Sequence, residues 1–165
     1  IGTIELLSTR PISDLAIIMG KYLACVTLVL LALLPTIIYY YSVNKLGNPP
    51  GNIDTGAMLG SYFGLLLLGF CYAAIGIWVS SLTENQIVAL LLTMALCFTF
   101  YEIIGLVGDI KALDKIGKSL EWFGLNYHYR SISRGMLDSR DIIYFMSFSA
   151  LFIWLTKLNL QRRKI

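Results

Sequence analysis

The chain has 165 residues, of which 57% are hydrophobic and only 14% are charged. This composition is too apolar for the surface of a soluble globular protein, so lipid must be the solvent for much of that surface. The formal net charge of +3 is small. Because the chain also has no long basic run, the charge pattern argues against nucleic acid as a partner.

Four charge-poor hydrophobic runs are each long enough to cross a bilayer, which takes about 20 apolar residues in a helix. They cover residues 15–43, 57–82, 86–106 and 141–160. The first contains Pro35, and the last needs Lys157 to extend its ammonium group to the lipid headgroups. Backbone amides in lipid must be satisfied within their own segment, and the alternation typical of a barrel is absent. We therefore predict an all-α, polytopic transmembrane helix bundle that forms a single domain over residues 1–165.

The segments before and between the first three runs are more polar than the runs themselves, and each predicts a different local structure. Residues 1–14 carry apolar side chains at positions 1, 4, 7 and 12, a pattern that predicts a short amphipathic helix before Pro11. Residues 42–55 are rich in Asn, Pro and Gly, which predicts an aqueous loop. The tight polar connection at residues 80–86 predicts an antiparallel hairpin of the second and third runs. The helix caps predicted here are Ser13 or Asp14 for the first run and Ser81 or Thr83 for the third.

Residues 107–140 mix basic and acidic side chains and then carry an aromatic cluster. This pattern predicts one or two short helices in an extracytoplasmic interfacial segment, with the rings at headgroup depth. Gly135 is expected to end the second of them, and Asp138 to cap the last membrane span.

Small residues recur along the second run in a pattern that lets helix backbones approach closely. The positions are Gly56, Gly60, Gly64, Gly69 and Gly76. Packing within the chain is favoured over a subunit interface or a moving seam. Glu102 is the acidic residue well inside a run, which makes it a possible intramembrane polar site or, one turn from the end of its run, a headgroup-level side chain.

Two groups of residues raise the question of catalysis or metal binding. His128, Ser131, Ser133 and Asp138 include the residue types of a hydrolytic triad, but an interfacial helix followed by a cap explains them better, because no nucleophile elbow is present. The cysteines are at positions 25, 71 and 97, one in each of the first three runs without CxxC spacing. We interpret them as packing residues, and we predict no catalytic residue, metal ligand or bound cofactor.

Three segments, taken together, resemble the permeases of ABC-2 type ABC transporters. They are residues 2–13 (GTIELLSTRPIS, followed by Gly20 and Lys21), residues 75–86 (IGIWVSSLTENQ) and residues 128–145 (HYRSISRGMLDSRDIIYF). Within that family the chain most resembles the gliding-motility-associated permease subunit. The resemblance is colinear over essentially the whole chain. It implies spans three to six of six, and with a first residue that is Ile rather than Met we expect an N-terminally truncated fragment.

The resemblance also implies partners and a mechanism. Residues 1–14 would be the cytoplasmic coupling helix that docks into an ATP-binding subunit, through Thr3, Ile4, Glu5, Leu7, Arg10 and Pro11. The chain has no GxxxxGK[ST] sequence, so ATP would be bound and hydrolysed by that partner and the chain itself would not be an enzyme. A second copy or a homologous permease would complete the transporter within the lipid bilayer.

The expected function is therefore to couple ATP hydrolysis to export, or to a gliding or secretion machinery, in the bacterial inner membrane. Counts of Lys and Arg do not decide the orientation. We place the N-terminal side and the basic tail, residues 161–164, in the cytoplasm, because this tail is not neutralised by acidic residues. The alternatives are a non-transporting membrane assembly factor driven by an ATPase and, less favoured, a small intramembrane enzyme.

Overall fold

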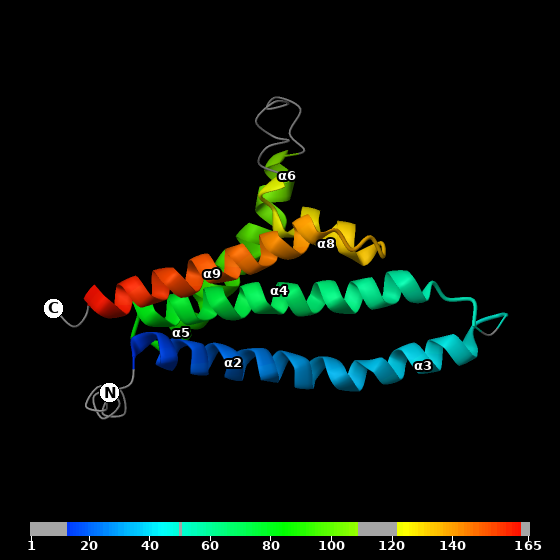
Figure 1. Cartoon of the computed structure of the whole chain (residues 1–165), viewed down its shortest axis with the longest axis horizontal. Coiled ribbons are helices and arrows are strands. Elements are labelled where there is room, and N and C mark those ends of the chain that lie inside the picture. Colours follow the sequence, from blue (N-terminus) through cyan, green and yellow to red (C-terminus); the bar gives the residue numbers. More distant parts are fainter. Residues whose placement is uncertain (1–12, 50, 109–121, 163–165) are drawn as a thin grey trace.

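A computed structural model describes residues 13–49, 51–108 and 122–162 of the chain (Figure 1). All regular structure in these residues is helical. Four helical stretches are long and apolar enough to cross a membrane: Asp14–Leu46, Thr55–Leu82, Gln86–Leu106 and Ser139–Arg162. The predicted fold class, an all-α bundle with several membrane helices, is confirmed.

The first stretch is a helix with a short change of winding at its proline. It comprises α2 (Asp14–Leu33), the 3-10 turn η1 (Leu34–Thr36) and α3 (Ile37–Leu46). Ser13 caps α2 as predicted, because its Oγ accepts a hydrogen bond from the amide of Ala16 at 3.3 Å. Pro35 has no amide hydrogen to donate, which accounts for the tighter turn around it. The turn-rich connection begins at Gly47 rather than at residue 42, since α3 continues to Leu46.

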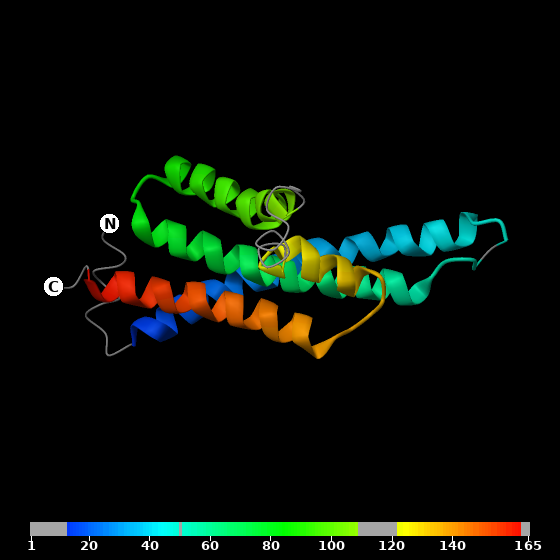
Figure 2. The same cartoon turned by 90° about the horizontal axis from the view of Figure 1, so that it is seen from above.

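The helix α4 (Thr55–Leu82) lies at the centre of the bundle and contacts α2, α5, α8 and α9 (Figure 2). Its N-terminus is capped by Asp54, whose Oδ1 accepts hydrogen bonds from the amides of Gly56 and Ala57 at 3.0 and 3.1 Å. Two clusters of buried side chains lie along it. One joins α4 to α2 and α9, and the other joins α4 to α8 and α9.

The third stretch, predicted as the span 86–106, contains a bend. It comprises α5 (Gln86–Phe98), the π-helical segment η2 (Thr99–Ile103) and α6 (Ile104–Gly108). Figure 1 shows α6 turning away from the direction of α5. Insertion of a π-helical turn is a recognised cause of such kinks. The predicted cap of this stretch, Ser81 or Thr83, is wrong: Asn85 is the cap, and its Oδ1 accepts from the amides of Ile87 and Val88.

The helices α8 (Leu125–Ser133) and α9 (Ser139–Arg162) are joined by a short turn. Gly135, with φ +81°, follows the end of α8, and the Oδ1 of Asp138 accepts from the amide of Arg140 at 2.9 Å at the start of α9. Both sequence predictions for this turn are therefore confirmed. α8 lies against α4 and α9, with Leu125, His128 and Ile132 buried.

Candidate functional site

Two glycines of α4 allow α8 to cross it closely. A Cβ atom added to Gly60 would collide with the carbonyl oxygen of Ile132, and one added to Gly64 would lie 3.0 Å from the ring of Tyr129. Only glycine allows the two backbones to approach this closely. The crossing fixes α8 beside the first half of α4, and thereby positions the polar side chains that α8 carries.

The other glycines of the predicted packing stripe have different neighbours. Gly56 lies beside Gly135, Gly69 faces Val29 of α2 at 2.7 Å from an added Cβ, and Gly76 lies at ordinary contact distance from Thr93 of α5. The glycines of the predicted stripe therefore contact different helices, because α4 has neighbours on several sides.

A buried pair of titratable side chains joins α8 to α9. The Nδ1 atom of His128 lies 2.7 Å from the Oδ1 of Asp141, and its Nε2 atom lies 2.9 Å from the carbonyl oxygen of Trp122. His128 is 2% exposed and Asp141 is 6% exposed. The His128 ring stacks on Tyr144, with ring centroids 3.9 Å apart, and the Tyr144 hydroxyl donates to the carbonyl of Phe123 at 2.6 Å.

Hydrogen bonding limits the protonation states of this pair. The carbonyl of Trp122 can only accept, so Nε2 must carry a hydrogen. One further proton then lies between Nδ1 and the Asp141 carboxylate, giving either an imidazolium with a carboxylate or an imidazole with a carboxylic acid. Both forms are neutral overall, which suits a pair that is almost completely buried. Neither leaves a free nitrogen lone pair on His128 that could serve a serine as general base.

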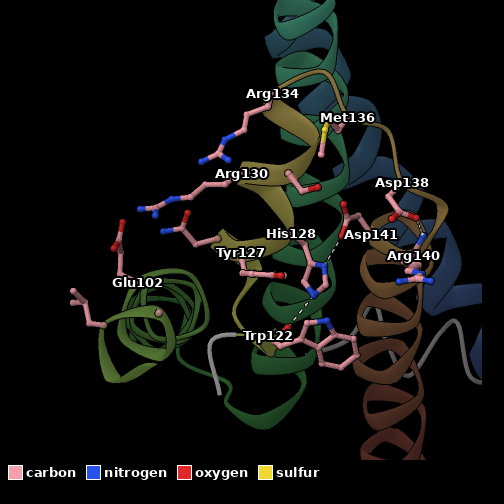
Figure 3. A pocket seen from close by; sticks show the side chains of 14 residues that line it. Glu102, Trp122, Tyr127, His128, Arg130, Arg134, Met136, Asp138, Arg140 and Asp141 are labelled. Carbon is pink, nitrogen blue, oxygen red and sulfur yellow. Dashed lines mark hydrogen bonds and ion pairs between the residues drawn. The ribbon is translucent and has the colours of Figure 1, made fainter. Parts of the chain in front are cut away.

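A polar groove opens beside this pair, between the η2–α6 segment, α8 and the start of α9 (Figure 3). Its volume is about 540 Å³. The charged side chains that line it are Glu102, Arg130, Arg134, Asp138, Arg140 and Asp141. We refer to this cavity as the polar groove. It is the feature of the described residues that combines a cavity with several charged groups.

The polar groove contains one residue singled out from the sequence and several that sequence reasoning missed. Glu102, the candidate intramembrane or headgroup-level residue, lies in the π-helical segment at its edge. The pairing of His128 with Asp141 was not predicted, since the sequence analysis grouped His128 with Asp138. The sequence signal that could have revealed this pair was Asp141, an acidic residue in the first turn of the otherwise apolar last span. The predicted coupling residues, Thr3, Ile4, Glu5, Leu7, Arg10 and Pro11, lie outside the described residues.

Comparison with known proteins identifies the family. The model of the family described as "ABC-2 family transporter protein" matches residues 1–160. The chain belongs to the ABC-2 transporter family. It is therefore a multi-pass membrane protein and a membrane permease component of an ABC transporter. No curated protein and no solved structure matches it. In this ABC-2 permease, the polar groove and the buried pair beside it lie at the start of the last membrane helix, α9.

Proposed function

We propose that this ABC-2 permease converts ATP hydrolysis by a separate ATP-binding subunit into movement of its membrane helices, and that this movement serves export or a gliding or secretion machinery. The observation that carries the proposal is the family match over residues 1–160, combined with four apolar helices in the same stretch. These residues contain no phosphate-binding GxxxxGK[ST] loop, and the proposal accordingly assigns ATP hydrolysis to the ATP-binding subunit.

The arrangement of the helix ends supports this proposal. The start of α2, the α4–α5 connection and the end of α9 lie together at one end of the bundle (Figure 1). At that end the Nδ2 of Asn159 donates to the carbonyl oxygen and to the Oγ of Ser81, at 2.7 and 3.0 Å. A force applied at this end by a partner would therefore move α4 and α9 together, because the two helices are hydrogen-bonded at this point.

In the sequence, only Ile12 and Ser13 separate the proposed coupling segment, residues 3–11, from the start of α2. Ser13 caps α2, and Asp14 begins it. Because so little chain separates the two, movement of the segment would be transmitted to α2 with little slack. From α2 it would reach α4 through the buried side chains of Tyr22 and Val26.

A charge reversal in the segment tests the coupling proposal. Glu5→Lys should leave membrane insertion intact, because the residue lies outside every span, but should weaken association with the ATP-binding subunit by bringing like charges together. The experiment is detergent co-purification of the full-length permease with that subunit. Lys45→Glu, a reversal near the end of α3 at the opposite end of the bundle, is the control. Equal recovery of the ATPase by wild type and both variants would remove the coupling assignment.

We further propose that the permease resides in the bacterial inner membrane with the coupling end in the cytoplasm. Residues 42–55 and 107–140 then face the periplasm, and residues 80–86 face the cytoplasm. Single cysteines at positions 48 and 84, introduced after replacement of Cys25, Cys71 and Cys97, test this orientation in intact cells. A membrane-impermeant thiol reagent should reach position 48 only. Labelling of position 84 alone would reverse the orientation.

A further inference from the structure

Two facing walls of the polar groove carry opposite charges. Arg130 of α8 and Arg134, the residue that follows its last turn, project to the same side, and Glu102 faces them from η2 (Figure 3). Among the described residues no ion pair joins Glu102 to either arginine, although all three are solvent-accessible. These three charged side chains are therefore not paired with one another, and Asp138 and Arg140 line the groove at the start of α9.

The position of the groove matches the depth of lipid headgroups. Glu102 lies 16 residues after the start of α5 at Gln86, which corresponds to about 24 Å of helical rise. A bilayer hydrocarbon core is about 30 Å thick. With Gln86 near one boundary, Glu102 lies just inside the other, and the arginines of α8 reach toward the same level. The kink at η2 turns α6 sideways there, away from the direction of α5 (Figure 1).

An apolar surface continues from the groove toward the hydrocarbon. Leu106 lines the groove and is exposed, and Ile103 and Phe98 are exposed on the same helical stretch. A molecule bound in the groove could therefore place an acyl chain along α5 and α6. This continuity favours an amphiphile over a soluble ion, which would gain nothing from the apolar surface.

We propose that the polar groove binds a phospholipid headgroup that carries both a phosphate and a primary ammonium group. The phosphate accepts charge-assisted hydrogen bonds from Arg130 and Arg134, and the ammonium group lies against Glu102. The acyl chains extend along the exposed side chains of η2 and α6. The site goes beyond the proposed coupling function and does not depend on it.

The charge distribution selects this class of lipid over others. Guanidinium groups are the side chains best suited to phosphate oxygens, so a lipid without phosphate would leave both arginines unused. A headgroup that is only anionic would meet the carboxylate of Glu102 without a positive group to offset it. The zwitterionic headgroup is the one that matches both walls.

Native mass spectrometry of the full-length permease tests the proposal. The purified protein is exchanged into detergent containing equal amounts of phosphatidylethanolamine, phosphatidylglycerol and diacylglycerol, and the retained lipids are counted. Wild type should retain phosphatidylethanolamine in preference to the other two. Arg134→Gln should lower retention of both phospholipids roughly tenfold through loss of a charge-assisted contact. Glu102→Gln should lower retention of phosphatidylethanolamine but raise that of phosphatidylglycerol.

Lys45→Gln is the matched control, because it removes one cation from the last turn of α3, outside the groove. It should retain lipids as wild type does. Thermal melting of each variant in detergent verifies that it is folded. Equal retention of all three lipids by wild type, an equal loss in Lys45→Gln and Arg134→Gln, or no opposite response to Glu102→Gln would each overturn the proposal.

Discussion

The last membrane helix, α9, and the third helical stretch, residues Gln86–Leu106, show opposite relations between hydrophobicity and burial. α9 is the least apolar of the four membrane helices, yet it buries several side chains against α4 and α8. The Gln86–Leu106 stretch is more apolar, but its most hydrophobic window contains no buried residue. In a soluble protein the more apolar helix would be the more buried one.

The difference follows from the solvent. Lipid is as apolar as a leucine side chain, so hydrophobicity drives a helix into the membrane but does not drive it against another helix. Helices associate there through close packing and polar contacts. The buried polar residues of α9, Asp141, Ser149 and Thr156, lie on its inward face, whereas α5 has leucines and other apolar side chains exposed. Which helices form the core is therefore decided by small and polar residues.

If close packing holds the core helices together, overpacking the α4–α8 crossing should have the largest effect on the amount of folded permease. Gly60→Leu would force a side chain into the backbone of α8 at Ile132, which cannot shift without separating the helices. We expect little or no folded permease, measured as a monodisperse peak in fluorescence-detected size-exclusion chromatography.

Gly20→Leu is the matched control, because Gly20 also lies within a membrane helix and has nothing within 4 Å of an added Cβ. It should give amounts of folded protein close to wild type. Comparable yields of both variants would show that close packing at the crossing does not hold α8 to α4.

Breaking the buried pair should have the next largest effect. Asp141→Leu removes the carboxylate that shares a proton with His128 and leaves either a buried imidazolium without its counter-ion or a buried Nδ1 atom without a hydrogen-bond partner. We expect a loss of about 3 kcal/mol in the free energy of unfolding, seen as a lower melting temperature in detergent. Asp138→Asn also removes a carboxylate, three residues away, but keeps a capping side chain, so it should be nearly neutral. Equal melting temperatures for the two variants would contradict the role assigned to the pair.

The sequence predicted the features that depend on local chemistry. Runs of apolar residues located the membrane helices, and Ser13, Gly135 and Asp138 have the predicted roles at helix ends. Each of these depends on a few neighbouring residues, and capping and positive φ restrict the choice of residue strongly.

Features that depend on contacts between distant residues were not predicted. The pairing of His128 with Asp141 needs the turn between α8 and α9 to bring the two side chains together, and nothing in the local sequence specifies that distance. The cap at Asn85 was missed because Ser81 and Thr83 have equally suitable side chains. The π-helical turn that places Glu102 beside the arginines has no distinct sequence signature.

The smallest effect is expected on the exposed face of α5. Leu91 is 61% exposed, whereas Leu67 of α4 is 3% exposed and packs against α8 and α9. Leu91→Ala should change the free energy of unfolding by less than about 0.5 kcal/mol, because the side chain faces lipid in both variants and alanine is a good helix former. Leu67→Ala should cost about 2–5 kcal/mol, through the cavity it leaves. Thermal melts of both variants in detergent, at two protein concentrations, provide the measurement.

A loss of stability for Leu91→Ala as large as that for Leu67→Ala would mean that α5 is covered by protein rather than exposed to lipid. If that cost also fell on dilution, the covering surface would belong to a second permease, because only an interaction between chains responds to protein concentration.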